Sequence, residues 1–182
     1  MNQLQRQMLD EARGRRPDAT MILEVGCGQG AFLNQLTDVY PSAELVGIDI
    51  SAQAIEAARR RSFPSTPIQW HVASVEHLPF SDETFDVVFA GKTMHHWENK
   101  QRALSQIARV LKDEGLLVLG DPFTDGPLRS PWFNRLNERL DGGTFTSLED
   151  LKSMLAQARL HLVTKQFVPW SGKTLSVCVI SK

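Results

Sequence analysis

The chain has 182 residues, enough for one domain with a buried core and too few for two domains of ordinary size. Its 20 basic and 21 acidic residues leave a net charge of -1, which excludes the strong positive field expected of a protein that binds nucleic acid or an anionic membrane. The first residues are polar, no apolar run is long enough to span a membrane, and the two cysteines favour reduced thiols, so we predict a cytoplasmic protein.

An N-terminal helix is predicted within residues 1–16, because Leu4, Met8 and Leu9 fall on one helical face. Two roles are open to this helix. It could cap a binding site, or it could only cover the edge of a sheet.

The stretch 21–32 combines a strand, a glycine turn and the start of a helix. Its first five residues form a mostly apolar run typical of a buried parallel strand, and apolar residues spaced three and four apart from Ala31 onward predict a helix. Three alternating glycines, Gly26, Gly28 and Gly30, form the turn between them. Because glycine accepts positive φ and has no Cβ, a ligand can lie directly against this backbone, so we predict that the turn seats a cofactor.

A second apolar strand, residues 43–48, is followed by Asp49, which is placed to hold the hydroxyls of a ribose. With Glu24 in the first strand, the pattern Glu-Val-Gly-Cys-Gly-Gln-Gly followed by Val-Gly-Ile-Asp-Ile resembles the class I S-adenosylmethionine-dependent methyltransferases of the ubiquinone/menaquinone C-methyltransferase-like superfamily. The same glycines and Ala31 also satisfy the looser dinucleotide fingerprint. A nicotinamide-dependent oxidoreductase therefore stays open as an alternative.

The resemblance implies where the adenine of the cofactor lies. A helix over residues 52–61, capped by Ser51, and a strand over residues 68–72 lead to a segment in which the family usually carries an acidic residue that contacts the adenine amino group. This chain has Ser74 at that position, and the next backbone amide belongs to Val75. We predict that both residues lie beside the adenine, and that the hydroxyl binds it more weakly than a carboxylate would.

The fourth strand, residues 85–90, should point its carboxyl end at the cofactor, which predicts that Ala90 to Trp97 line the reacting side. Within this segment, His95 and His96 suggest a general base, because an unperturbed imidazole titrates near neutrality. The alternative is that one ring packs and the other forms hydrogen bonds. We expect no metal, because no carboxylate or cysteine cluster completes a coordination shell around the two histidines.

The remaining regular elements complete the family pattern. A helix is predicted over residues 99–112 and a fifth strand over residues 115–120, and Thr146 to Glu149 has the pattern of a capping box that opens a further helix. Two β-rich runs, residues 160–168 and 173–181, predict an antiparallel hairpin. This hairpin resembles the methyltransferase arrangement in which a seventh strand is inserted between the fifth and the sixth.

Residues 121–145 form an insertion, which in the family often contributes to the acceptor pocket. Trp132 and Phe133 could give that pocket an aromatic wall, and Trp97 is a further candidate for contact with the substrate. The two aromatic residues of the insertion also belong to an apolar helical stripe over residues 132–140, which could instead pack on the sheet.

The resemblance covers about residues 20–182 and implies a single α/β domain over residues 1–182. The expected architecture is a three-layer Rossmann-like sandwich around a seven-stranded, mostly parallel sheet of order 3-2-1-4-5-7-6 with an antiparallel last strand. The implied reaction moves the methyl group of S-adenosylmethionine to a small-molecule acceptor by in-line displacement and leaves S-adenosylhomocysteine. The implied cofactor contacts are Glu24, Gly26, Cys27, Gly28, Gly30, Asp49, Ile50, Ser74, Val75 and Ala90.

A second function stays open beside methyl transfer. A protein with the methyltransferase fold could bind S-adenosylmethionine or S-adenosylhomocysteine without catalysis and act through a partner. The chain carries little beyond the minimal fold to enclose an acceptor, which keeps this alternative in view. The acceptor atom, whether oxygen, nitrogen or carbon, and the oligomeric state stay open at this point.

Overall fold

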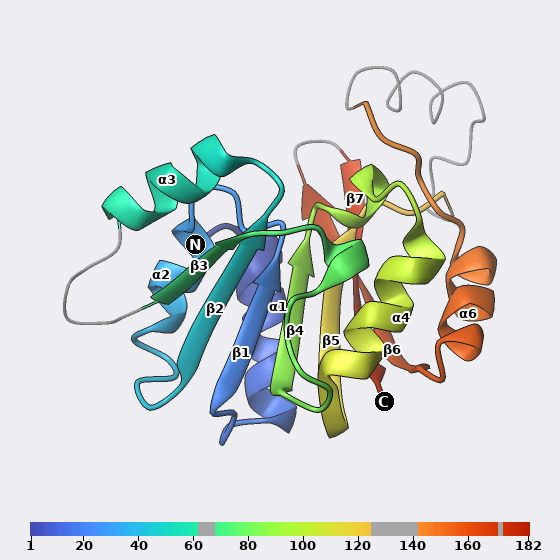
Figure 1. Cartoon of the computed structure of the whole chain (residues 1–182). Helices are drawn as coiled ribbons and strands as arrows, with labels where there is room; N and C mark the ends of the chain where they lie inside the picture. Colours follow the sequence, from blue (N-terminus) through green and yellow to red (C-terminus); the bar gives the residue numbers. More distant parts are fainter. Residues whose placement is uncertain (62–67, 125–141, 171–172) are drawn as a thin grey trace.

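A computed structural model describes residues 1–61, 68–124, 142–170 and 173–182. Its middle layer is a seven-stranded sheet in the order β3-β2-β1-β4-β5-β7-β6, in which only β7 runs antiparallel to its neighbours (Figure 1). This confirms the strand order and the antiparallel strand predicted from the sequence. The strands are β1 (Met21–Val25), β2 (Glu44–Asp49), β3 (Ile68–Val72), β4 (Phe85–Gly91), β5 (Leu111–Asp121), β6 (His161–Trp170) and β7 (Lys173–Ser181).

Helices cover both faces of the sheet, with α1 behind the strands and α4 and α6 in front of them in Figure 1. Within the described ranges, every helix is too short or too polar to span a bilayer. The α-helices are α1 (Gln3–Arg15), α2 (Ala31–Leu36), α3 (Ala52–Arg61), α4 (Lys100–Val110) and α6 (Leu148–Gln157), and the short 3-10 helices are η1 (Val75–His77) and η2 (Met94–His96).

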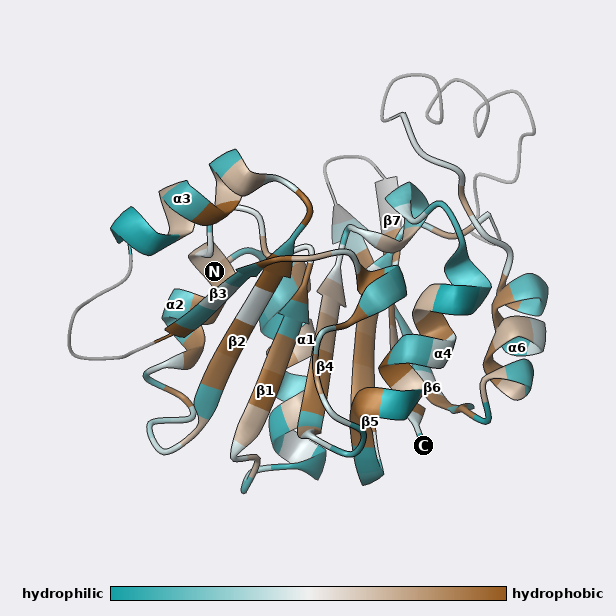
Figure 2. Ribbon diagram, viewed as in Figure 1, coloured by the Kyte–Doolittle hydropathy of each residue, from teal (hydrophilic) through white to brown (hydrophobic). Residues whose placement is uncertain are grey.

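The sheet separates two hydrophobic clusters. Successive strand residues point to opposite faces, so Ile22 packs with α1, α2 and α3, while Leu23 packs with α4 and α6. In β4, Phe89 joins the first cluster and Val88 the second. The central strands consist mostly of apolar residues (Figure 2) and contribute to the clusters on both faces, which is what a parallel sheet between two helical layers requires.

The N-terminal helix covers a face of the sheet. Met8 and Leu4 are buried against β5, where a Cβ on Gly120 would lie 2.7 Å from the Met8 sulfur and 2.9 Å from Leu4 Cδ1. Gly91 at the end of β4 also approaches Met8. Residues 1–16 are not part of the lining of the cleft described below. The helix α1 packs on a face of the sheet and not on its edge.

Two local expectations were wrong in detail. The fifth strand begins at Leu111, because Leu111 pairs with Phe85 before the register shifts, so α4 ends at Val110. The helix α6 is capped by Ser147, whose hydroxyl accepts the backbone N–H of Asp150, one residue later than the predicted cap. Thr146 is engaged elsewhere: it forms a β-bridge with Phe123.

Asp86 is a buried ionic anchor at the amino end of β4. Its carboxylate accepts the backbone N–H groups of Thr20 and Met21, each at 2.9 Å, and lies 2.8 Å from the Lys112 ammonium. Burial by itself would raise the pKa of Asp86, but the Lys112 contact and these hydrogen bonds outweigh it and lower the pKa to about 2. The ionised carboxylate of Asp86 therefore links β4 to β1 and β5.

The pH dependence of stability should reveal this anchor. Because the pKa of Asp86 in the folded chain lies below its ordinary value of 3.8, Asp86 stabilises the fold above about pH 4, and this stabilisation is lost as the pH falls towards 2. In urea unfolding, the difference in free energy of unfolding between the wild type and Asp86→Asn should shrink by about 2 kcal/mol between pH 5 and pH 2. A difference that stays constant over this range would contradict the assignment.

Candidate functional site

A cleft of about 620 Å³ opens at the carboxyl ends of β1 to β4. Strand β1 is flanked by β2 on one side and β4 on the other, so the chain reverses its direction of winding at this point, which is where open parallel sheets bind ligands. Among the described residues, no group of three His, Cys, Asp or Glu side chains is placed to hold a metal ion.

The structure brings some of the predicted site residues to the wall of this cleft and leaves others behind it. The predicted residues that line the cleft are Gly26, Asp49, Ile50, Ser74, Val75, His96 and Trp97. Six others lie outside its lining, namely Glu24, Cys27, Gly28, Gly30, Ala90 and His95. Trp132 and Phe133 fall outside the described residues.

Lys92 and Thr93, which also line the cleft, belong to the segment from Ala90 to Trp97 that was predicted to do so. Five further residues of the lining were not predicted: Ile48, Ala73, Glu76, His77 and Glu98. Each lies in a strand end or loop that also holds a predicted residue. Their place in the lining could have been predicted from the rule that ligands bind at the carboxyl ends of parallel strands, but their residue types by themselves do not indicate a binding site.

The three glycines of the turn are needed for different reasons. A Cβ on Gly30 would lie 2.9 Å from Trp70 Cζ2, so this position is reserved for the packing of β3. A Cβ on Gly26 would collide with Thr93, whose Cβ is 2.8 Å away. A Cβ on Gly28 would meet no atom of residues 1–61, 68–124, 142–170 or 173–182 within 4 Å, and Gly28 has a φ of +53°. Gly28 thus presents bare backbone to open space.

Asp49 ends β2 beside the same turn. One carboxylate oxygen accepts the backbone N–H of Gly28 and the other that of Ser51, both at 2.9 Å. These bonds fix the orientation of the carboxylate at the wall of the cleft. The next residue, Ile50, is 76% exposed although it is apolar. An exposed apolar side chain in the lining of the cleft suits contact with a flat, apolar ligand surface.

Glu24 lies behind the turn as an incompletely satisfied carboxyl group. It is 7% exposed, and its Oε2 has no hydrogen-bond partner in the described part of the chain. Burial raises its pKa well above the usual range, the backbone hydrogen bond of Leu33 lowers it, and the nearby Asp49 carboxylate raises it further. A ligand that brings a positive charge or a hydrogen-bond donor to this end of the turn would relieve the orphaned oxygen.

Two other predicted contacts are also buried. Burial, followed by the charges of Glu24 and Asp49, raises the pKa of the Cys27 thiol far above its ordinary value, so this cysteine is not a thiolate nucleophile. Ala90 pairs with Val25 in the sheet and is fully buried.

A short segment beyond β3 forms the next wall of the cleft. Ser74 caps η1, with its hydroxyl accepting the backbone N–H of Glu76 at 3.2 Å. Glu76 also lines the cleft, and one of its carboxylate oxygens accepts the backbone N–H of Asn99 at 2.8 Å. The carboxylate that stands two residues after Ser74 is therefore already engaged with the start of α4.

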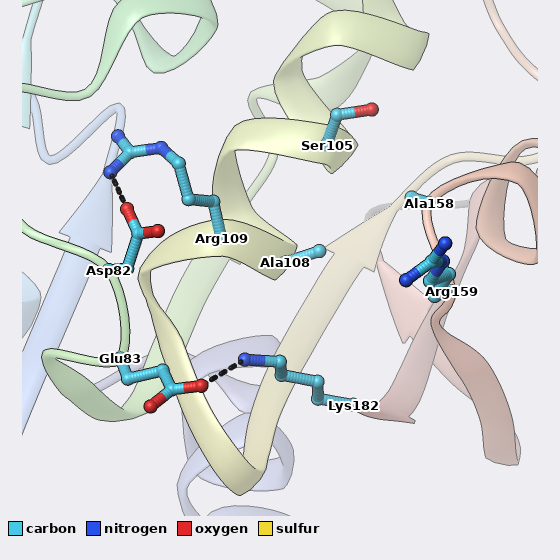
Figure 3. Close-up of a pocket in the computed structure, with 8 residues that line it drawn as sticks. All are labelled: Asp82, Glu83, Ser105, Ala108, Arg109, Ala158, Arg159 and Lys182. Atoms are coloured by element: carbon cyan, nitrogen blue, oxygen red, sulfur yellow. Dashed lines mark hydrogen bonds and ion pairs between the residues drawn. The ribbon is translucent and has the colours of Figure 1, made fainter.

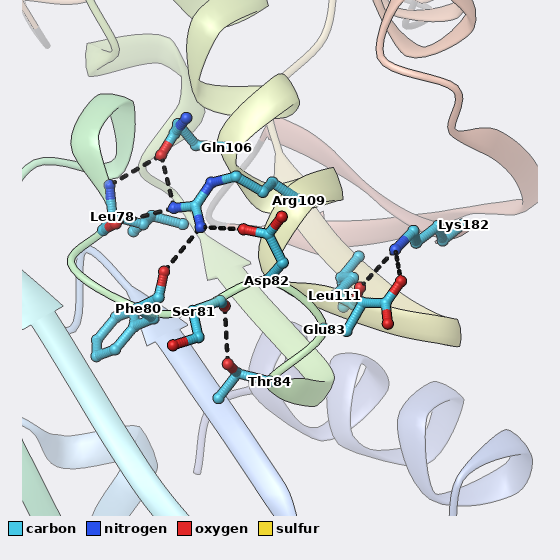
Figure 4. Close-up of polar contacts among 10 residues, drawn as sticks. All are labelled: Leu78, Phe80, Ser81, Asp82, Glu83, Thr84, Gln106, Arg109, Leu111 and Lys182. Atoms are coloured by element: carbon cyan, nitrogen blue, oxygen red, sulfur yellow. Dashed lines mark hydrogen bonds and ion pairs between the residues drawn. The ribbon is translucent and has the colours of Figure 1, made fainter.

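Helix α4 holds this segment in place through a row of polar side chains. Gln106 accepts the backbone N–H of Leu78, and Arg109 donates to the carbonyl oxygens of Leu78 and Phe80 at 2.9 and 2.7 Å (Figure 4). Arg102, one turn before Gln106, donates to the carbonyl oxygen of Glu76 at 3.1 Å. The position of the cleft wall is thus fixed by side chains of the helix behind it.

A second hollow, of about 260 Å³, lies near Lys182 and the C-terminal end of α4 (Figure 3). Its acidic residues pair with two of its basic ones: Asp82 lies 2.8 Å from Arg109, and Glu83 lies 3.4 Å from Lys182. The hollow is smaller than the cleft and holds none of the predicted site residues. The cleft is the candidate site.

The two histidines predicted as a general base have different surroundings. His96 is exposed and lines the cleft, whereas His95 is 7% exposed and lies behind it. The Nδ1 atom of His95 is 2.8 Å from a carboxylate oxygen of Asp121. The two rings face each other with centroids 4.0 Å apart and a tilt of 44°. The structure therefore places one ring in the core and the other at the wall of the cleft.

Comparisons with known proteins agree with this geometry. Residues 23–119, more than half of the chain, match the methyltransferase domain family. The chain is 36% identical to O-methyltransferase cnsE of Penicillium expansum over 78% of its own length and 52% of the relative, so it spans about half of that protein. It is also 30% identical to O-methyltransferase rstn1 of Aspergillus nomiae, over 85% of its own length and 68% of the relative.

The fold is shared with solved structures as well. The N-methyltransferase NodS of Bradyrhizobium japonicum, solved with S-adenosylhomocysteine, superimposes with a TM-score of 0.76 at 19% identity, covering 98% of this chain and 85% of NodS. At this level of identity, the likeness concerns the fold alone.

Proposed function

Because the chain belongs to the family of S-adenosylmethionine-dependent methyltransferases, we propose that it moves the methyl group of S-adenosylmethionine to a small-molecule acceptor in the cleft and releases S-adenosylhomocysteine. The observation that carries this proposal is the pairing of Gly28 with Asp49. Bare backbone and an oriented carboxylate meet there through a 2.9 Å hydrogen bond, and no protein atom fills the space a Cβ on Gly28 would take.

The residues fit the cofactor in chemistry as well as in place. Asp49 is oriented to accept the ribose hydroxyls, Ile50 offers an apolar surface to the adenine, and Ser74 and Val75 border the same end of the cleft. Glu24 has an oxygen free to receive the amino group of the cofactor's methionine part. Gly26 and Gly28 allow close approach of the ligand to the backbone, and the buried Gly30, Cys27 and Ala90 support the turn from behind.

The bound cofactor supplies an activated methyl group on a sulfonium. The protein's part is to align the acceptor and to exclude water. Positioning of this kind can lower the activation free energy by roughly 7 to 11 kcal/mol without an acid or a base. Trp97 is placed at the wall of the cleft to contact the acceptor, and Trp132 and Phe133 stay predictions for the same role.

An oxygen acceptor is favoured by the named activity of the two relatives, both of which are O-methyltransferases. A hydroxyl acceptor must lose its proton to a base during transfer, whereas a carboxylate acceptor needs no base, because its negative charge and the positive charge of the sulfonium cancel as the ester forms. His96 is the histidine that faces the cleft, and we assign it the role of proton acceptor. His95 does not line the cleft, so it can influence the acceptor only by way of His96.

A methyl-transfer screen tests the function. The chain would be incubated with S-adenosylmethionine labelled in the methyl group and with a panel of phenols, hydroxy acids, carboxylic acids, thiols and amines. Labelled product from an oxygen acceptor is the expected result. Tight binding of S-adenosylhomocysteine without transfer to any member would favour the non-catalytic alternative, and a melting shift with NADH but not with S-adenosylhomocysteine would revive the oxidoreductase.

Replacement of His96 tests its role once an acceptor is known. We expect His96→Gln to lower kcat by about 100-fold, because a general base typically contributes 10² to 10⁴ in rate. The affinity for S-adenosylhomocysteine should stay unchanged, since the cofactor would lie on the glycine turn. Unaltered turnover and an unaltered pH profile would remove His96 from the mechanism.

A further inference from the structure

Asp121, the last residue of β5, is a buried carboxylate that the proposed function does not yet use. It is 2% exposed. Its two oxygens accept hydrogen bonds from one short turn: the backbone N–H of Met94 at 2.9 Å and the Nδ1 of His95 at 2.8 Å. A buried carboxylate is costly unless it is well partnered, so its presence here serves the turn that carries the two histidines.

The bond to Asp121 selects one tautomer of His95. An ionised carboxylate can only accept hydrogen bonds, and a backbone N–H can only donate them, so the Met94 contact leaves the second oxygen as an acceptor for the ring. The proton of neutral His95 must therefore lie on Nδ1, and Nε2 carries the lone pair.

Contacts with residues 143–145 also fix the backbone and the ring of His95. Its backbone oxygen accepts the N–H of Thr144 at 2.8 Å, and a Cβ on Gly143 would lie 2.7 Å from its ring atom Cδ2. The ring of Phe145 stands edge-on, with centroids 5.7 Å apart. Two chain segments that are distant in sequence thus fix one imidazole.

His96 rests on this fixed ring. Their centroids are 4.0 Å apart, and His96 forms part of the wall of the cleft. His96 therefore packs against a ring whose Nδ1 is bound by Asp121.

We propose that Asp121 is a positioning residue for methyl transfer: it holds His95 with its proton on Nδ1, so that His96, packed on that ring, faces the acceptor. The inference rests on the proposed function, in which His96 contacts the acceptor. Asp121 itself contacts neither cofactor nor acceptor in this account, and it acts through His95.

The tautomer can be measured directly in the full chain. Long-range proton–nitrogen correlation spectra report which imidazole nitrogen is protonated, and a His95→Gln variant assigns the signal of His95. In the wild type we expect the proton on Nδ1. In Asp121→Asn, the amide oxygen can still accept from Met94 while the amide N–H₂ donates to Nδ1, which moves the ring proton to Nε2.

The functional readouts separate positioning from simple stability. With the acceptor found by the screen, kcat of Asp121→Asn should fall at least 10-fold, while KM for S-adenosylmethionine and the affinity for S-adenosylhomocysteine change less than twofold. Asp86→Asn is the matched control, because it also replaces a buried carboxylate with an amide. Asp86 lies at the amino end of β4, whereas the turn that carries His95 follows the carboxyl end of this strand. We expect Asp86→Asn to lower stability and to leave both the His95 tautomer and kcat unchanged.

Two results would overturn the inference. One is a wild-type His95 with its proton on Nε2, a measurement that needs no variant and so holds even if Asp121→Asn does not fold. The other is a kcat that Asp121→Asn does not alter. A chain that binds no S-adenosylhomocysteine and methylates nothing would instead refute the proposed function, and the wild-type tautomer would still decide the geometry claimed for Asp121 and His95.

Discussion

Replacing Gly28 with valine should abolish the binding of S-adenosylhomocysteine while the chain still folds. A Cβ at this position would meet no atom of the described residues within 4 Å. The backbone N–H of Gly28 is bound to Asp49, a residue of the cleft wall, and the new side chain would stand beside the place where the ligand meets the turn. We expect the affinity to fall by at least 100-fold, about 3 kcal/mol, in isothermal titration calorimetry.

Gly142→Val is the matched control for this variant. Gly142 also has a positive φ, +71°, and within the described part of the chain a Cβ there would likewise meet nothing within 4 Å. Both substitutions place a β-branched residue in the left-handed region, so each should cost stability by a similar amount, on the order of 1 to 3 kcal/mol. Only Gly28→Val should lose the ligand. Equal affinities in the two variants would remove the glycine turn from the binding site.

Replacing Asp49 with alanine should weaken binding of the same ligand by about 1 to 3 kcal/mol, which is roughly 5- to 150-fold in the dissociation constant. The carboxylate is held at the wall of the cleft by the N–H groups of Gly28 and Ser51. Its removal takes away the acceptor for the ribose hydroxyls and also leaves those two donors to find water.

Glu44→Ala provides the comparison on the same strand. Glu44 stands at the exposed beginning of β2, whereas Asp49 stands at its end beside the cleft. The change at Glu44 removes an acidic group of the same sign without touching the cleft, so it should leave the affinity within twofold of the wild type. A loss of affinity that is equal in both variants would show that net charge, and not the contact with Asp49, governs binding.

The sheet could be predicted from the sequence because its strands carry local signals. Apolar runs that end in a glycine turn or at Asp49 marked β1 and β2, and the two β-rich runs near the C-terminus marked the hairpin of β6 and β7. Their order followed from the resemblance to a known family, and the structure has the same order. The boundary between α4 and β5 could not be read, because Leu111 suits either element and its pairing with Phe85 decides the matter.

A residue of the candidate site could be predicted where its type and its position along the chain have a single explanation. Asp49 is such a case, because it ends a strand beside the glycines and lies in the cleft. The contact of Gly30 with Trp70 could not be predicted, because Trp70 comes from a later strand and no local pattern reveals that it occupies the space a Cβ on Gly30 would take.

Asp121 and His95 show the same limit more sharply. They are 26 residues apart in sequence, and their contact depends on the register between β4 and β5 and on the turn that follows β4. The histidine pair drew attention because of its chemistry, yet the sequence gives no sign of which ring faces the cleft. The fold separates them by burying His95 against β5 and Phe145.

A crystal structure of the chain grown with S-adenosylhomocysteine tests the central claim most directly. We predict that the ligand lies across the ends of β1 and β2, with its ribose hydroxyls within hydrogen-bond distance of the Asp49 carboxylate and its amino-acid end over Gly26 and Gly28. Ligand density elsewhere on the molecule, or a cleft closed by side chains in the presence of saturating ligand, would contradict the account.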